Sequence, residues 1–121
     1  MDKEQTLDEF WNSFGWKAYD ENTIPKGTPL PYITYTVVVD SIGNDVALSA
    51  SLWQRSTSWQ GVTEMKDAIG ERLGLGGKIF PFGDGAIWLK RGQPFAQRMS
   101  DEDDGIRRIY INITAEFISA D

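Results

Sequence analysis

Apolar residues recur along this chain with two spacings, and each spacing predicts one kind of element. Residues 4–14 carry apolar side chains at the spacing of one helical face. These side chains are Leu7, Phe10, Trp11 and Phe14. Thr6, with Glu9 three residues later, has the pattern of a capping box and is expected to begin this helix. Gly15 suits the end of the helix, and the proline-rich residues 20–31 are expected to form a connector.

Two neighbouring strands are predicted over residues 32–39 and 46–54. Every residue of the first segment is β-branched or aromatic, as is typical of strands. The second segment alternates strictly: Val46, Leu48, Ala50 and Leu52 point one way, and Ala47, Ser49, Ser51 and Trp53 point the other. The turn-forming residues 41–45 predict that the two strands form a hairpin. The alternation predicts a sheet that is covered on one face and polar on the other.

A second helix is predicted from Thr57 or Ser58, either of which can cap it, to about Leu73. Its apolar stripe consists of Trp59, Val62, Met65, Ile69 and Leu73. Its charged side chains, Glu64, Lys66, Asp67, Glu71 and Arg72, are expected to face water. The glycines that follow Leu73 should end this helix.

Three more strands are predicted over residues 86–91, 95–99 and 107–118, with the acidic residues 101–104 in a hairpin loop. In the last strand, Ile109, Ile111, Ile113, Ala115 and Phe117 share one face. The expected fold is α+β: a mainly antiparallel sheet of four to five strands with two α-helices packed on one face. We expect a single domain over residues 1–121, in which residues 1–30 form the N-terminal helix and connector and the sheet with its central helix follows.

Composition limits the chemistry available to the chain. Its 121 residues include 12 basic and 18 acidic residues, for a formal net charge of −6, and neither His nor Cys. A Ser-His-Asp triad, a Cys nucleophile, a Cys/His zinc site and a disulfide framework are therefore excluded. Residues 1–21 and 101–104 each carry a net charge of −4, and the body between them is slightly basic. Such a chain is poorly suited to grip nucleic acid through its phosphates.

Two stretches come close to ligand-binding motifs but miss them. The glycines of residues 74–78 follow a predicted helix, and Ile79 stands where a phosphate-binding loop needs Ser or Thr. The acidic residues 101–104 lack the alternate spacing and the twelfth-position Glu of a calcium loop. We therefore expect a helix stop at the first and a solvated hairpin loop at the second, with no cofactor and no metal.

An enzymatic role has few candidate residues. A carboxylate-based hydrolase needs two carboxylates that face each other across a cleft. Asp40 and Glu116 lie inside or beside predicted strands, and Glu116 suits an ordinary cross-strand pair. We expect no enzyme, with a small carboxylate-based hydrolase as the alternative from another class. No apolar run approaches the ~20 residues of a membrane helix, and the acidic N-terminus lacks the apolar stretch of a signal peptide, so no membrane partner is expected.

Aromatic residues make up 12% of the chain, and this surplus favours a protein that works by contact. The candidate interface residues are Trp53, Arg55, Trp88, Arg91, Arg98 and Tyr110, and the candidate acidic loop consists of Asp101, Glu102, Asp103 and Asp104. Trp53 and Tyr110 fall on predicted polar faces, where they are either covered by a second layer or form a subunit contact. The arginines are candidates to pair with acidic groups of a neighbour, although one exposed ion pair contributes little.

Four segments together resemble tail terminator, or tail completion, proteins of long-tailed phages and prophages. These segments are PYITYTVVV (31–39), SASLWQRSTSW (49–59), GVTEMKDAIGERL (61–73) and AIWLKRGQPFAQRMSDEDDGIRRIYINITAEFI (86–118). They cover about three quarters of the chain. The shared pattern is a Pro-Tyr strand, a strand with Trp53 and Arg55 that leads into a helix, and a last strand ending in Ala-Glu-Phe. It is a pattern of order and length and not a catalytic signature.

The resemblance implies a non-enzymatic α+β subunit that assembles as a hexameric ring at the head-proximal end of the phage tail tube. Such a ring stops tube polymerisation and joins the tail to the head–tail connector. The implied partners are further copies of the chain, the tail-tube protein and the connector, and DNA passes through the lumen without specific binding. The implied location is the virion, after assembly in the host cytoplasm. A head–tail joining protein of similar topology is the nearest alternative.

Overall fold

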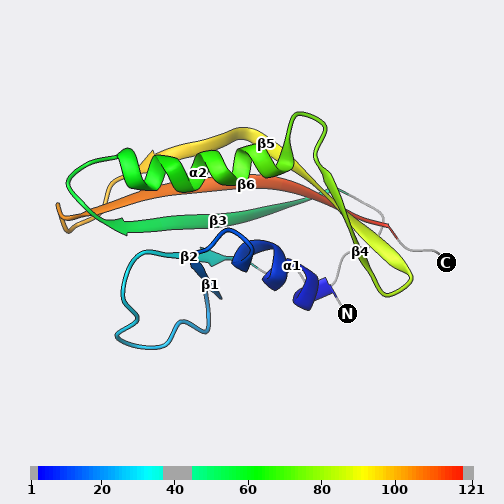
Figure 1. The fold of residues 1–121 in the computed structure, drawn as a ribbon, viewed down its shortest axis with the longest axis horizontal. Coiled ribbons are helices and arrows are strands. Elements are labelled where there is room, and N and C mark those ends of the chain that lie inside the picture. The colour runs from blue at the N-terminus through cyan, green and yellow to red at the C-terminus, as the bar shows by residue number, and fades with distance from the viewer. Residues whose placement is uncertain (1–2, 37–44, 119–121) are drawn as a thin grey trace.

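A curled six-stranded sheet with two helices on its inner side makes up the fold, in a computed structural model that describes residues 3–36 and 45–118 (Figure 1). The elements are α1 (Lys3–Asn12), β1 (Lys17–Asp20), β2 (Tyr32–Tyr35), β3 (Asp45–Arg55), α2 (Gln60–Leu73), β4 (Lys78–Phe82), β5 (Gly85–Met99) and β6 (Ile106–Ile118). The α+β class agrees with the sequence prediction. The prediction of four to five strands is wrong, because the described residues form six.

The strands lie in the order β1-β2-β3-β6-β5-β4. β1 and β2 run parallel, and every other neighbouring pair in the described sheet is antiparallel. The predicted antiparallel pairing of the strands expected over residues 32–39 and 46–54 is confirmed for β2 and β3, with Tyr32 opposite Trp53 and Tyr35 opposite Ala50. Residues 37–44, which include most of the predicted turn, lie outside the described residues.

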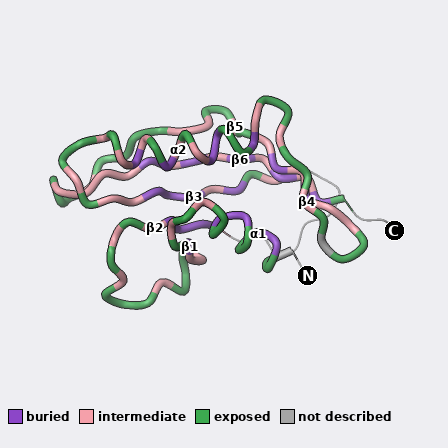
Figure 2. The backbone as a smooth tube through the Cα atoms, in the orientation of Figure 1, coloured by how far each residue is buried: buried purple, intermediate pink, exposed green. Residues whose placement is uncertain are grey.

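One face of the sheet forms the core, and it is the face that the alternation predicts. The buried residues of β3 and β6 are Leu48, Ala50, Leu52, Ile109, Ile111, Ile113, Ala115 and Phe117. α2 covers this face with the buried residues Val62, Met65, Ile69 and Leu73. Figure 2 shows the buried layer along α2 and the strands that it covers. Because each such side chain contributes about 1.5–3 kcal/mol when buried, this layer is the main source of stability.

α1 packs on the same inner face and joins two distant parts of the sheet. The ring of Trp11 stacks on Tyr35 of β2 with 6.2 Å between centroids. The ring of Phe10 meets Phe80 of β4 edge to face, 5.3 Å away. β2 and β4 are separated by three strands in the sheet order, so contact of both with one helix requires the sheet to curl around α1.

Both helices begin at positions that differ from the predictions. α1 starts at Lys3 and ends at Asn12, so Thr6 is a buried residue inside the helix and the predicted capping box is wrong. α2 starts at Gln60, and the residue before it has no side-chain cap. The hydroxyl of Ser58 accepts a hydrogen bond from the Gln60 N–H at 3.1 Å, which forms a local turn just before the helix. The predicted stop after Leu73 is confirmed, because Gly74 caps α2 with a φ of 64°.

The sequence did not predict the strands β1 and β4, nor that β5 is one continuous strand. β1 and β4 contain four and five residues, too few to display a period, and both are stabilised by pairing with a neighbour. The segments predicted as two strands over residues 86–91 and 95–99 form a single strand, β5. Gly92 and Pro94 lie in a register shift between Arg91 and Ala96, so the strand bends there without ending.

The two edge strands of the sheet, β1 and β4, are both partly closed to further pairing. The amide side chain of Asn12 accepts a hydrogen bond from the Ala18 N–H at 3.0 Å and donates one to the Ala18 carbonyl at 3.3 Å. β4 contains Pro81, which has no N–H to offer. Exposed strand edges invite association with other chains. The edges of this sheet are therefore poorly suited to pair with a further strand. Contact with another chain is more favourable on its open face.

Tyr35 gives the fold a specific weakness at alkaline pH. Its hydroxyl is buried and donates a hydrogen bond to Asp8 at 2.7 Å. Burial, the hydrogen bond with Asp8 and the nearby carboxylate charges together raise the pKa of Tyr35 far above its ordinary value. The unfolded chain releases this proton near the ordinary pKa of about 10, whereas the folded chain keeps it. The contribution of Tyr35 is thus complete below about pH 10 and decreases above it, by about 1.4 kcal/mol per pH unit.

We therefore predict that, above pH 10, the free energy of unfolding of the Tyr35→Phe variant decreases less steeply with pH than that of the wild type. At neutral pH the variant should be about 1 kcal/mol less stable, because the hydrogen bond to Asp8 is missing. Denaturant unfolding curves at a series of pH values test both statements. Parallel pH profiles for the two proteins would contradict the assignment.

Candidate functional site

A row of aromatic rings ending in an arginine crosses the open face of the sheet, opposite the helices. We call Tyr19, Tyr32, Trp53 and Arg108 the aromatic–arginine row. Tyr19 and Tyr32 meet edge to face at 6.0 Å, and Tyr32 and Trp53 lie 6.4 Å apart. The guanidinium of Arg108 lies 4.6 Å from the centre of the Trp53 ring. The row thus spans four neighbouring strands, β1, β2, β3 and β6.

The register of the sheet places this row on the open face. Residues on the open side of β3 alternate with the core residues Leu48, Ala50 and Leu52. Trp53 lies opposite Tyr32 on one side and opposite Arg108 on the other. The four side chains of the row are half-buried, which leaves each of them partly accessible to a neighbour.

Buried hydroxyl groups hold the row in place. The indole N–H of Trp53 donates to the hydroxyl of Thr34 at 3.0 Å. Arg108 donates to the hydroxyl of Ser51 through Nε at 3.0 Å and through one terminal nitrogen at 2.9 Å. Both hydroxyl-bearing residues are buried beneath the larger side chains. The orientations of Trp53 and Arg108 are therefore set before any partner arrives, which lowers the entropic cost of binding.

Arg108 carries a positive charge that no carboxylate neutralises among the described residues. Its contacts are the face of Trp53 and the hydroxyl of Ser51. A stacked guanidinium keeps N–H donors for a carboxylate or a carbonyl of another chain. Tryptophan, tyrosine and arginine are the residues most enriched among the energetic centres of protein interfaces. The chemistry of the row thus suits a protein–protein contact.

The predicted interface residues fall on three parts of the fold. Trp53 and Tyr110 lie together on the open face, as the polar-face positions predicted. Trp88 is also on the open face, since it lies opposite Glu116, but it belongs to the other end of the sheet. Its indole N–H donates to the Gly76 carbonyl at 2.9 Å, and the amine of Lys90 lies 4.2 Å from the centre of its ring.

Of the predicted interface arginines, Arg91 and Arg98 lie on the helix side of the sheet, whereas Arg55 lies on the same side of β3 as Trp53. Arg91 contacts α2 and donates to the Gly70 carbonyl at 2.7 Å. Arg98 also lies on the helix side, with its guanidinium 4.6 Å from the centre of the Trp59 ring. Arg55 lies at the end of β3 and pairs with Asp103 of its own chain at 3.3 Å. The roles of all three in an interface remain predictions.

The acidic loop forms the turn between β5 and β6, as predicted. Asp103 accepts a hydrogen bond from the Gly105 N–H at 2.7 Å. This bond, followed by the interaction with Arg55, lowers the pKa of Asp103 below its ordinary value. Asp101 accepts a hydrogen bond from the Asp103 N–H at 2.9 Å, which tightens the turn. Within the described residues no group of three or more acidic side chains is arranged to hold a metal ion.

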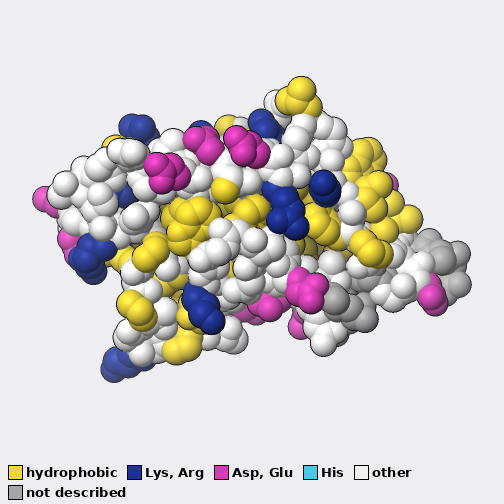
Figure 3. All heavy atoms as spheres, viewed as in Figure 1, with side chains coloured by type: hydrophobic (Ala, Val, Ile, Leu, Met, Phe, Trp, Pro, Cys, Tyr) yellow, Lys and Arg dark blue, Asp and Glu magenta, His cyan; other side chains and the backbone are white. Residues whose placement is uncertain are grey.

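A second exposed area lies at the end of the sheet that carries β4. Leu75, Ile79 and Ile118 are 98%, 60% and 42% exposed, and we call them the end patch. Figure 3 shows hydrophobic side chains gathered at this end of the molecule. Ile79 lies opposite Trp88, and Ile118 follows Glu116 by two residues on the same side of β6, so both side chains share the open face, while Leu75 lies in the loop before β4. Exposed apolar side chains of this kind mark interaction sites. The end patch is therefore a second candidate surface for contact.

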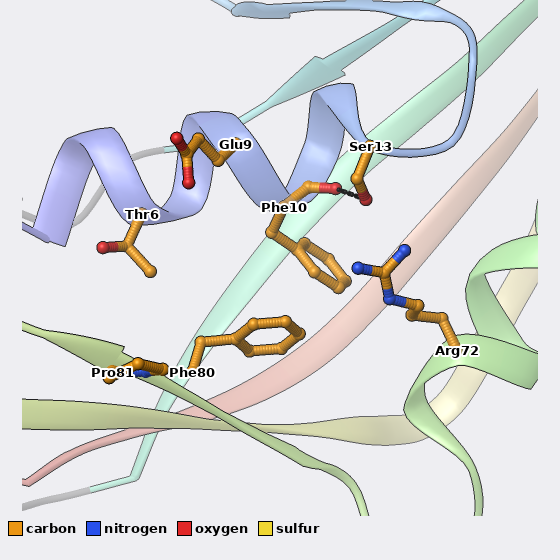
Figure 4. A pocket seen from close by; sticks show the side chains of 7 residues that line it. All are labelled: Thr6, Glu9, Phe10, Ser13, Arg72, Phe80 and Pro81. Atoms are coloured by element: carbon orange, nitrogen blue, oxygen red, sulfur yellow. Dashed lines mark hydrogen bonds between the residues drawn. The ribbon is translucent and has the colours of Figure 1, made fainter.

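A hollow of about 440 Å³ lies between α1, the end of α2 and β4 (Figure 4). Its lining residues are Thr6, Glu9, Phe10, Ser13, Arg72, Phe80 and Pro81. Phe10 and Phe80 meet edge to face at its wall, and Arg72 reaches toward them from α2. Among the described residues that line it, Glu9 is the single carboxylate, so they do not supply the opposed pair that a carboxylate-based hydrolase needs.

Two smaller hollows lie between α2 and β5. The described lining of the one of about 190 Å³ includes the cations Lys66 and Arg98 and no carboxylate. The one of about 170 Å³ includes Asp67 and Glu71, which are both on α2 and therefore do not face each other across a cleft. None of these three hollows has the geometry of glycoside hydrolysis.

Of the aromatic–arginine row, the predicted interface residues include Trp53 alone. Tyr19 fell between predicted elements, because β1 is short and gains its place only by pairing with β2. The sequence pattern predicts a strand at Tyr32 but does not assign its side chain to either face of the sheet. The register of the predicted hairpin was the available signal, because it sets Tyr32 opposite Trp53.

The fold and the open face define a class: an α+β protein with a curled sheet, helices on one side and an aromatic surface on the other. No helix in the described part of the chain is long and apolar enough to span a membrane. No protein-family model matches the sequence, and no curated protein matches it.

A chain in a solved structure described as "Virion of native gene transfer agent (GTA) particle" has a similar fold. The TM-score is 0.54 at 18% sequence identity, and the alignment covers 93% of this chain and 84% of that chain. At this identity the likeness shows that the two chains share a fold.

Proposed function

We propose that this protein is a structural subunit of a phage-like virion, and more narrowly a tail terminator. In this role it forms a ring, expected to be a hexamer, at the head-proximal end of the tail tube. The ring stops tube polymerisation and offers its other side to the head–tail connector, while DNA passes through its lumen. The protein works by contact and not by catalysis.

The observation that carries the proposal is the shared fold with a chain of a gene transfer agent virion, over nearly the whole of both chains. The aromatic–arginine row supports it independently, because a pre-oriented row of this composition on an open sheet face suits a subunit contact. The narrower assignment to the tail terminator depends on the sequence resemblance described above. The acidic loop suits a surface that DNA passes without being held.

Co-assembly with tail-tube protein tests the proposed function. Purified protein added to polymerising tube subunits should stop tubes at a defined length and appear as a ring at one end in electron micrographs. Light scattering of the mixture should show a species several times the subunit mass. Binding to portal or connector protein without binding to the tube would favour a head–tail joining protein. Strictly monomeric protein at every concentration, with no rings on tubes, would contradict the proposal.

A further inference from the structure

Two separate areas of the molecule are suited to contact. The aromatic–arginine row lies on the β1, β2, β3 and β6 side, and the end patch lies around β4. α1, a cylinder about 10 Å wide, touches both β2 and β4 through Trp11 and Phe10. Because the sheet curls around this helix, the outward directions at β2 and at β4 diverge. One flat partner surface cannot cover both areas, so each area has its own neighbour.

The two areas carry complementary charges that cannot meet within one chain. Arg108 ends the row, and Glu116 lies on the same face of the same strand, opposite Trp88 and two residues before Ile118 of the end patch. Glu116 lies eight positions after Arg108 in the strand, which corresponds to about 27 Å. Neither has an oppositely charged partner among the described residues. Both are half-buried, so an ion pair formed with a second chain would be shielded from water.

We propose that the end patch of one subunit docks on the aromatic–arginine row of a second copy, with Glu116 of the first placed to meet Arg108 of the second. This inference rests on the proposed function and names the surfaces through which the subunits join. The contact is heterologous, because two different surfaces of the chain meet. Each subunit can therefore bind one neighbour through its row and another neighbour through its end patch. Repeated contacts of this kind form a ring when the rotation between neighbouring subunits closes on itself.

Two variants, each lacking one surface, test the inference. Leu75→Asp combined with Ile79→Asp removes the end patch at exposed positions, where folding should be little affected. Trp53→Ala removes the centre of the row, and Tyr32→Ala serves if that variant does not fold by circular dichroism. Each variant alone should associate at least about 30-fold more weakly than the wild type. The control Gln60→Asp, on the exposed start of α2, should assemble normally.

Mixing the two variants gives the decisive result. The end-patch variant keeps an intact row, and the row variant keeps an intact end patch, so the mixture can form one good contact and no second. Light scattering should therefore show a one-to-one dimer that does not grow with concentration. A mixture that stays monomeric, or that forms assemblies of wild-type size, would overturn the inference.

The outcome separates this inference from the proposed function. Wild-type assembly together with normal assembly of both variants would overturn the docking surfaces and leave the virion role standing. Wild-type protein that stays monomeric alone and with tail-tube protein would overturn the proposed function, and this inference with it.

Discussion

Replacement of Trp11 by Ala is expected to destabilise the protein by about 3–5 kcal/mol. The Trp11 side chain has no exposed surface, and its ring stacks on Tyr35 and meets Phe10 edge to face at 4.9 Å. Its removal leaves a large cavity between α1 and β2. Because α1 also contacts β4, the loss should loosen the curl of the whole sheet.

Denaturant unfolding of wild type and variant measures this effect. Trp16→Ala is the matched control, since it removes the same atoms from a half-buried position at the rim of the core. The control should lose clearly less stability than Trp11→Ala. Equal losses in the two variants would contradict the role given to α1.

Gly77→Ala is expected to cost about 1–3 kcal/mol, although it adds a single methyl group. Gly77 has a φ of +79°, in the left-handed region that favours glycine. An added Cβ would lie 2.5 Å from the Leu89 carbonyl oxygen and 2.8 Å from the Trp88 indole nitrogen. The backbone oxygen is held in the pairing of β4 with β5, so the start of β4 must move.

The neighbouring glycine supplies the control. A Cβ on Gly76 would meet no heavy atom within 4 Å, and Gly76 has no positive φ. Gly76→Ala should therefore leave the midpoint of thermal unfolding close to that of the wild type, whereas Gly77→Ala should lower it. If both variants unfold at the same temperature, the close approach of this loop to β5 is not a constraint on the fold.

The proposed function depends on one asymmetry of the sheet, namely that its inner face is covered and its other face is open. Both helices pack on the inner face, and the two edges are partly closed by Asn12 and Pro81. The open face carries the aromatic–arginine row, and the exposed end patch lies at the end of the sheet that carries β4. A molecule of this kind is well suited to join copies of itself by face contacts, which is what a ring-forming virion subunit requires.

The local sequence pattern was sufficient to predict the buried face of an element wherever that element is long enough to show its own period. The alternation in residues 107–118 predicted the buried face of β6 residue by residue, and the stripe ending at Leu73 predicted the buried face of α2. Hydrophobic burial selects these faces directly, because a shift by one residue would expose every apolar side chain of a strand. The open-face positions of Trp53 and Tyr110 followed from the same rule.

Tertiary contacts decided the elements and sites that have no period of their own. β1 and β4 are strands because a neighbour pairs with them, and β5 continues through Gly92 and Pro94 because β6 supports it on both sides of the bend. Arg91 lies before the register shift in β5, and Arg98 lies after it. Because the shift changes which alternate residues face the helices, both arginines lie on the helix side. The sequence alone determined the fold class, the core faces and the absence of His and Cys chemistry. The curl around α1, and with it the divergence of the two contact areas, arises only when residues far apart in the chain pack together.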